Sequence, residues 1–256
     1  EHVEVAAVLS SLGALYRAQG KYSEAEPLTR RALGIREKAL GPEHPDVAVS
    51  LYELGALHYS QGKAAEAEPL YRRAVAIWEG NQGANPLDLA AALGHLAEYY
   101  FSQGRLGEAE PLYAKALAIR DETPGPEQAE TAAVVNGLAQ VRLALGKLAE
   151  AEPLYQRLLA HREKTLGPED AALNPVLGSL AGIYVRRGKY AEAEPLYRRL
   201  LAIAEKSFGA EHAAVAAALD GYEGLLRQAG RNAEAEKTAA RARAIREKSR
   251  PRKPGK

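Results

Sequence analysis

Residues 188–199 read Gly-Lys-Tyr-Ala-Glu-Ala-Glu-Pro-Leu-Tyr-Arg-Arg, and versions of this stretch return along the chain at a constant interval. The opening glycine keeps that interval in all six copies: Gly20, Gly62, Gly104, Gly146, Gly188 and Gly230, a period of 42 in the numbering. A fixed period of this kind is typical of proteins built from stacked repeats. The sequence therefore predicts a repeat domain over 1–249, with units at 5–46, 47–88, 89–130, 131–172, 173–214 and 215–249, and a disordered basic tail at 250–256.

Each unit carries two stretches with the apolar spacing of a helix, one on either side of the glycine. In the first unit the two apolar faces consist of Val5, Val8, Leu12 and Leu15, and of Ala25, Leu28, Ala32 and Ile35. Glycine ends a helix at little cost because it accepts a left-handed backbone. We therefore expect an all-α protein of six helix-turn-helix units. Asp46 and Asp88, the last residues of units 1 and 2, stand where they would cap the first helix of the unit that follows.

Composition excludes several classes of function. The 256 residues include no Cys, so disulfide frameworks, zinc ribbons and thiol nucleophiles are ruled out. We also find no Gly-rich phosphate loop, no nucleophile elbow and no His pair at metal-ligand spacing. The Glu-Ala-Glu triplets open the second helix of each unit, where negative charge stabilises a helix N-terminus. We therefore expect no enzyme, no metal and no cofactor.

The unit pattern resembles the tetratricopeptide repeat. Residues 32–46, Ala-Leu-Gly-Ile-Arg-Glu-Lys-Ala-Leu-Gly-Pro-Glu-His-Pro-Asp, and residues 188–199 resemble in particular the repeats of kinesin light chains and their bacterial relatives. The resemblance covers essentially the whole chain. It implies a right-handed solenoid of six units whose first helices line a concave groove. In that family the groove receives extended peptides from partner proteins.

Groove positions, by analogy with the family, fall at 10, 11, 14 and 17 and at the equivalent positions of the later units. These positions differ between units, whereas the packing positions do not. The candidate groove residues are Arg17, Tyr52, Glu53, Tyr59, His95, Glu98, Phe101, Asn136, Gln140 and Arg186. The family often carries an Asn pair at the first two of these positions, and here only Asn136 matches. We therefore expect no regular ladder of Asn side chains along the groove.

Two aromatic deviations from the repeat have two interpretations each. Tyr59 and Phe101 occupy the same register in adjacent units, and they either anchor an apolar side chain of a partner or pack against neighbouring units. Trp78 stands where four other units have Arg. It either marks a second contact surface outside the groove or lies flat over apolar neighbours.

The two ends of the chain differ in charge. Residues 237–256 hold nine basic residues and one acid, a net charge of +8, so the remaining residues carry −7 within the total of +1. The basic end is either a solvated end or a contact for an acidic partner, nucleic acid or an anionic membrane. The first unit shows no polar capping helix, so we expect further sequence upstream of Glu1, or self-association through the N-terminal face.

The function that this pattern favours is a scaffold that binds a partner protein or peptide through the groove. One alternative is a regulatory array of a larger signalling or effector protein whose catalytic domain lies elsewhere. Another is a solenoid that binds nucleic acid weakly through its basic C-terminus, although the groove charges are balanced and we do not expect nucleic acid there. No stretch is long enough to span a membrane, and without a targeting segment we expect a cytoplasmic protein.

Overall fold

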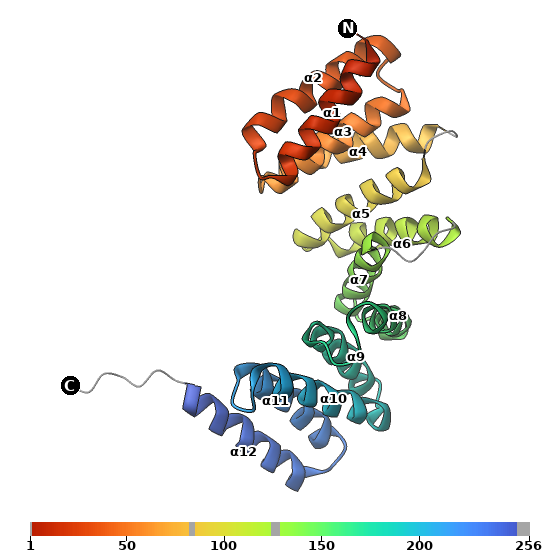
Figure 1. Cartoon of the computed structure of the whole chain (residues 1–256). Coiled ribbons are helices and arrows are strands. Elements are labelled where there is room, and N and C mark those ends of the chain that lie inside the picture. The colour runs from red at the N-terminus through yellow and green to blue at the C-terminus, as the bar shows by residue number, and fades with distance from the viewer. Residues whose placement is uncertain (1, 82–84, 124–128, 250–256) are drawn as a thin grey trace, which may run out of the picture. The chain divides into compact units, whose positions relative to one another are not determined.

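A computed structural model describes residues 2–81, 85–123 and 129–249, and within these ranges it contains helices and no strand. Figure 1 shows the helices in chain order. They are α1 (Val3–Ala18), α2 (Tyr22–Leu40), α3 (Pro45–Ser60), α4 (Ala64–Gly80), α5 (Pro86–Ser102), α6 (Leu106–Glu122), α7 (Ala129–Ala144), α8 (Leu148–Leu166), the 3-10 helix η1 (Ala171–Leu173), α9 (Asn174–Arg186), α10 (Tyr190–Phe208), α11 (Ala213–Gln228) and α12 (Asn232–Ser249). The all-α fold of helix-turn-helix units is thereby confirmed. Residues 250–256, predicted to form a disordered tail, lie outside the described residues.

The turn inside each unit depends on its glycine. Gly20 and Gly188 have φ angles of 74° and 72°, in the left-handed region that a side chain disfavours, and their four equivalents match them. The backbone N–H of the next residue then reaches back to the helix, as Lys21 N does to Tyr16 O at 2.9 Å. This closure is the typical glycine-dependent end of a helix, and it returns the chain antiparallel into the second helix.

The first helices begin with a different cap from the expected one. The Nδ1 atom of His44 accepts a hydrogen bond from Asp46 N at 3.1 Å, and His212 does the same for Ala214 N. Asn85 Oδ1 caps α5 by accepting from Leu87 N, also at 3.1 Å. The prediction that Asp46 and Asp88 are caps is therefore wrong. Both lie inside the first turn, where their charge favours the helix N-terminus.

Small residues allow the helices to pack closely. Ala25, Ala109, Ala151 and Ala193, one turn into second helices, are fully buried, as expected for close approach of helix axes. The second helices α2, α4, α6, α10 and α12 each lie beside the first helix of their own unit, and α2 and α4 also pack against the first helix of the next unit (Figure 1). The chain divides into two compact bodies, Glu1–Gly137 and Leu138–Lys256, which are described separately below.

Candidate functional site

A buried tyrosine recurs in the second helices and rests on the first helix of the following unit. The series is Tyr71, Tyr113, Tyr155 and Tyr197, each no more than 8% exposed. A methyl group added at Gly137 would lie 2.4–2.7 Å from the ring and hydroxyl of Tyr113, and one at Gly221 would lie 2.6–3.2 Å from Tyr197. Ser179 hydrogen-bonds Tyr155 at the equivalent place. The second position of the family's Asn pair is therefore occupied here by a residue that accommodates this ring.

The exception to this pattern is His95, which stands where Gly137 and Gly221 stand in later units. Its ring stacks on Tyr71, with the ring centroids 5.6 Å apart and the planes at 10°. Tyr71 is correspondingly close to its own unit's first helix, since a methyl group at Gly55 would lie 2.8–3.2 Å from that ring. Later units carry Ala97, Ala139 and Ala181 at the position of Gly55. The larger His95 on one side of the ring thus accompanies the smaller Gly55 on the other.

His95 is also the centre of an aromatic cluster on α3, α4 and α5. Its ring centroid lies 5.7 Å from that of Tyr52 and 6.2 Å from that of Tyr59. Tyr52 is in turn 5.8 Å from Tyr71. Burial raises the pKa of Tyr59 to about 12 and raises that of Tyr71 further. The Tyr71 hydroxyl is buried and has no hydrogen-bond partner among the described residues.

One carboxylate borders this cluster. Glu98 Oε2 lies 3.7 Å from His95 Nδ1, and the side chain of Glu98 is 49% exposed. Hydrogen bonds from His95 and then from Tyr59 hold the Glu98 pKa below its ordinary value, so the group is an anion at neutral pH. The other units carry Ala14, Ala56, Gln140, Gly182 and Gly224 at this position. The stacking of units therefore does not require an acid here.

A second acid lies in a small pocket between α1 and α3. The pocket has a volume of about 30 Å³, and its lining includes Arg17, Tyr52 and Glu53. Burial raises the pKa of Glu53, against the opposing effects of a Ser10 hydrogen bond and of Arg36 and Arg17. Arg36 itself is only 7% exposed and donates to Ser10 Oγ at 3.1 Å and to Ser50 Oγ at 2.6 Å.

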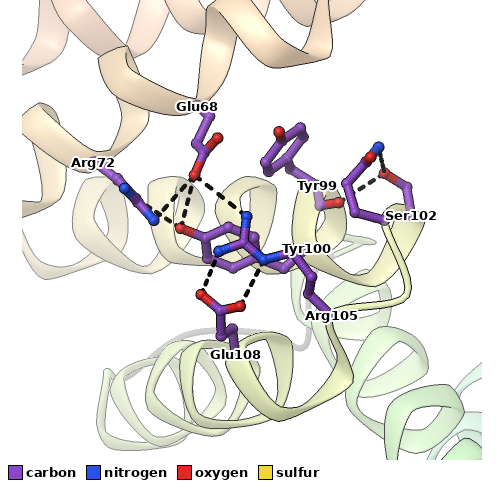
Figure 2. Close-up of polar contacts among 8 residues, drawn as sticks. Glu68, Arg72, Tyr99, Tyr100, Ser102, Arg105 and Glu108 are labelled. Atoms are coloured by element: carbon purple, nitrogen blue, oxygen red, sulfur yellow. Dashed lines mark hydrogen bonds and ion pairs between the residues drawn. The ribbon is translucent and has the colours of Figure 1, made fainter.

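The Glu-Ala-Glu triplets also connect successive units, in addition to placing negative charge at the N-terminus of their own helix. Figure 2 shows Glu68, the second acid of its triplet, in contact with Tyr100 and Arg105 of the next unit. The Tyr100 hydroxyl donates to Glu68 at 3.1 Å and accepts from Arg72 Nε at 2.7 Å, while the Arg105 guanidinium lies 4.2 Å from the Tyr100 ring. Arg105 also donates to Glu108, the first acid of the next triplet, at 2.5 and 2.6 Å.

The same junction recurs in the C-terminal body. Glu152 accepts from Lys189 of the next unit at 3.1 Å, and Glu194 accepts from Arg231 at 2.8 Å. Glu68 and Arg105 form the equivalent pair in the N-terminal body, with the same separation along the chain. The second acid of these three triplets, Glu68, Glu152 and Glu194, therefore binds a basic residue of the following unit. The recurrence of a basic residue immediately after each turn glycine was the sequence signal that could have revealed it.

The predicted groove residues are only partly brought together. Tyr52, Tyr59, His95 and Glu98 adjoin one another, and Arg17 and Glu53 line the pocket beside Tyr52. Phe101 is half-buried on α5, and the described ring contacts do not join it to Tyr59. Asn136 and Gln140 are half-buried on α7, and Arg186 is exposed at the end of α9. Gln140 and Arg186 belong to the C-terminal body.

Trp78 offers no contact surface. Its side chain is 3% exposed, and its ring centroid lies 6.1 Å from that of Tyr52. The second surface proposed at this position therefore lacks an accessible indole. The ring packs in the core because Trp78 stands at the place of Arg36, whose side chain is likewise turned inward.

The described residues do not assemble a metal site, because no group of three or more His, Asp or Glu side chains among them could hold an ion. Within the same residues, no helix combines the length and the apolar character needed to cross a bilayer.

Comparison with known proteins identifies one family. The tetratricopeptide repeat profile matches residues 4–80, 88–164 and 170–248. No curated protein sequence matches the chain. Among solved structures, a putative kinesin light chain from Podospora anserina with nearly identical tetratricopeptide-like repeats has 28% identity and a TM-score of 0.63, over 81% of this chain and 99% of that one.

Two further structures are similar in fold. BtubC, also called BKLC, from P. vanneervenii has 24% identity and a TM-score of 0.66, over 95% of this chain and 97% of its own. YrrB, described as a tetratricopeptide repeat protein with an unusual peptide-binding site, has 16% identity and a TM-score of 0.61, over 84% and 91% of the two chains.

Proposed function

Since the chain belongs to the tetratricopeptide repeat family, with repeats of the kinesin light chain type, we propose that it is a non-enzymatic scaffold that binds a partner peptide or protein. The contact is centred on Tyr52, Tyr59, His95 and Glu98, on the first helices of units 2 and 3. The observation that carries this proposal is the departure of α5 from the repeat. His95 and Glu98 replace residues that are small or uncharged at most of the equivalent positions.

The chemistry of these side chains suits recognition of a peptide. Aromatic rings provide a large contact area with few rotatable bonds, so they lose little entropy on binding. Tyr59 and His95 are already held by one another and by Glu98, which reduces the ordering required of the free protein. Glu98 supplies a fixed negative charge beside the rings, where a partner's backbone N–H or basic side chain gains a charge-assisted hydrogen bond.

Two features support the groove as the binding surface. YrrB shows that a protein of similar fold has a peptide-binding site, although its low identity to this chain carries no residue assignment. Arg17 and Glu53 are the equivalents, one unit earlier, of Tyr59 and His95. They line the pocket beside Tyr52 and so add polar groups next to the proposed contact. Phe101 and Asn136, which lie in the same body, are included as outer positions of the proposed contact.

The test is capture of the partner by the full chain and by the Tyr59→Ala/Phe101→Ala variant, with the retained proteins identified by mass spectrometry. Arg227→Ala is the matched control, because Arg227 has the same register in unit 6 and is exposed. We expect a partner that the parent and the control retain and the double variant loses. Equal capture by all three proteins, with unchanged helical circular dichroism, would discard the groove as the binding surface.

A further inference from the structure

The junction of units 1 and 2 lacks the tyrosine ring that fills the later junctions. Thr29 stands where the buried tyrosine series, which starts at Tyr71, would have its first member. The threonine is buried as well, with 3% exposure, and its hydroxyl donates to the carbonyl of Ala25 in its own helix at 3.1 Å. Because the smaller side chain bonds to its own helix, the space that a ring would take is left partly open.

This space is the pocket of about 30 Å³ between α1 and α3. Five of its eight lining residues have the register of the predicted groove: Ala14, Arg17, Tyr52, Glu53 and Ala56. The pocket is therefore part of the groove, beside the aromatic cluster to which Tyr52 belongs. One water needs about 10–15 Å³, so the pocket has room for a small group that takes roughly two such places.

Glu53 brings to this pocket a carboxylate with one unpaired oxygen. Its Oε2 atom is buried and has no hydrogen-bond partner among the described residues. The Glu53 side chain accepts a hydrogen bond from Ser10, whose Oγ accepts from the buried Arg36 at 3.1 Å. This relay orients the carboxylate, and the Arg36 charge favours its anionic form. A buried acceptor without a partner costs free energy, so a ligand that donates to Oε2 removes this cost.

Arg17 lines the same pocket and has hydrogen-bond donors only, whereas the Glu53 carboxylate only accepts. An occupant that satisfies both must donate and accept. This excludes the ammonium and guanidinium groups, which cannot accept and are repelled by Arg17. It also excludes a carboxylate, which cannot donate and is repelled by Glu53, and the volume excludes an aromatic ring.

Two neutral side-chain groups meet this requirement, a hydroxyl and a carboxamide. A hydroxyl is one heavy atom that both donates and accepts, so it fills one of the two places. A carboxamide fills both, with its NH₂ group in one and its oxygen in the other. The pocket therefore fits a carboxamide better.

We propose that this carboxamide pocket, defined as Arg17, Thr29 and Glu53, binds the side-chain amide of an Asn or Gln in the partner peptide. The amide NH₂ donates to Glu53 Oε2, and the amide oxygen accepts from Arg17. The inference rests on the proposed function, because it names a residue that the same groove selects. A peptide without the carboxamide is rejected because it leaves Glu53 Oε2 unpaired.

The test starts from a phage-displayed library of random peptides, selected on the full chain. We expect the selected peptides to share an Asn or a Gln at one position. In a fluorescent synthetic copy of one of them, replacing that residue by Ala should weaken binding to the parent by about tenfold or more. The same replacement should have almost no effect on binding to Thr29→Tyr/Glu53→Gly, which rebuilds the pairing of Tyr113 with Gly137 and so fills the pocket.

A charge exchange gives a second readout. A peptide with Asp in place of Asn, or Glu in place of Gln, should bind the parent weakly because its carboxylate faces Glu53. Glu53→Gln should bind that peptide better than the parent does, since the new amide donates to it. The matched control is Ser179→Gly, which changes the register of Glu53 in the C-terminal body and should bind the first peptide within about twofold of the parent.

Two results separate failure of the pocket from failure of the groove. Selected peptides that bind the parent and Thr29→Tyr/Glu53→Gly equally, and lose affinity in Tyr59→Ala, would show that the pocket holds only water, and they would overturn this inference alone. A selection without any peptide that binds the folded parent saturably overturns the proposed function and this inference with it. If the double variant does not fold, Glu53→Ala replaces it, and an unchanged preference for the carboxamide in that variant contradicts the proposal.

Discussion

The His95 and Tyr71 rings stack in nearly parallel planes across the junction of units 2 and 3, with ring centroids 5.6 Å apart. Gly55 leaves room for the Tyr71 ring on its other side. Later junctions reverse the arrangement, with Ala97 or Ala181 on the near helix and Gly137 or Gly221 on the far one. The large His95 side chain on one side of the Tyr71 ring is therefore accommodated because Gly55, on the other side, has no side chain.

This match predicts that Gly55→Ala destabilises the protein and that His95→Gly compensates for it. The added methyl group would lie 2.8 Å from Tyr71 Cε1, and overpacking of this kind costs about 1–3 kcal/mol. That cost exceeds the gain of roughly 0.5–1 kcal/mol from replacing Gly inside a helix. In Gly55→Ala/His95→Gly the ring can shift toward α5, so a double-mutant cycle by urea denaturation should show favourable coupling.

Gly34→Ala is the control for this cycle, because nothing lies within 4 Å of a methyl group at that position on α2. It should stabilise the protein by about 0.5–1 kcal/mol. Additive effects of Gly55→Ala and His95→Gly would contradict the matched-size explanation.

Removing the charge of Glu53 and removing that of Glu98 should change the stability of the protein in opposite directions. Burial raises the Glu53 pKa, so its contribution to stability is lost as pH rises through the folded value. Hydrogen bonds from His95 and Tyr59 lower the Glu98 pKa, so its contribution is present at neutral pH and is lost as pH falls through the folded value. At pH 7, Glu53→Gln should therefore raise the urea midpoint and Glu98→Gln should lower it.

The Glu53→Gln difference should shrink once the pH falls below the raised Glu53 pKa. The Glu98→Gln difference should persist below the ordinary glutamate value of about 4.3 and shrink only as the pH falls through the lowered Glu98 pKa. Fluorescence of Trp78, the single Trp, reports unfolding of unit 2, since its indole lies 6.1 Å from the Tyr52 ring of the aromatic cluster. Midpoint shifts of the same sign at pH 7 would show that one of these pKa directions is wrong.

The junction drawn in Figure 2 predicts that Glu68→Gln lowers the free energy of unfolding more than Glu79→Gln does. The Glu68 side chain is 18% exposed and contacts Arg72, Tyr100 and Arg105. Glu68→Gln should cost about 1.5–3 kcal/mol, the range for hydrogen bonds to charged groups. The comparison is Glu79→Gln, whose side chain is 42% exposed in its pair with Lys115 and which should cost less than about 1 kcal/mol. Equal costs in urea denaturation would exclude a special role for Glu68.

Burial of Trp78 predicts that Trp78→Ala affects folding rather than recognition. Removing a buried aromatic side chain costs about 3–5 kcal/mol, and the Trp78 side chain is 3% exposed. Thermal unfolding followed by circular dichroism should show a large drop in midpoint, while partner capture below that midpoint is retained. A variant of unchanged stability that loses capture would restore Trp78 as a contact residue.

The constant repeat period was sufficient to predict the helices and their turns, because each turn glycine has a local backbone requirement. The caps were assigned wrongly, since Asp46 and His44 are both able to cap and the choice depends on side-chain geometry. Tyr59, His95 and Glu98 were predicted as groove residues, and they adjoin one another. The stacking of His95 on Tyr71 was not foreseen, because it joins residues from different units, and a period identifies equivalent positions without showing which of them touch.

The ion pairs between successive second helices bear on how such a chain changes in evolution. Glu37 with Arg73, and Glu163 with Arg199, each divide one interaction between two consecutive units. A duplicated unit carries both the glutamate that pairs with the unit after it and the arginine that pairs with the unit before it. It therefore fits between existing units without further change, and the array can lengthen or shorten by whole units. His95 and Gly55 are the exception. A recombination that separates unit 2 from unit 3 would set His95 against a tyrosine backed by alanine, so these two units should be inherited as a pair.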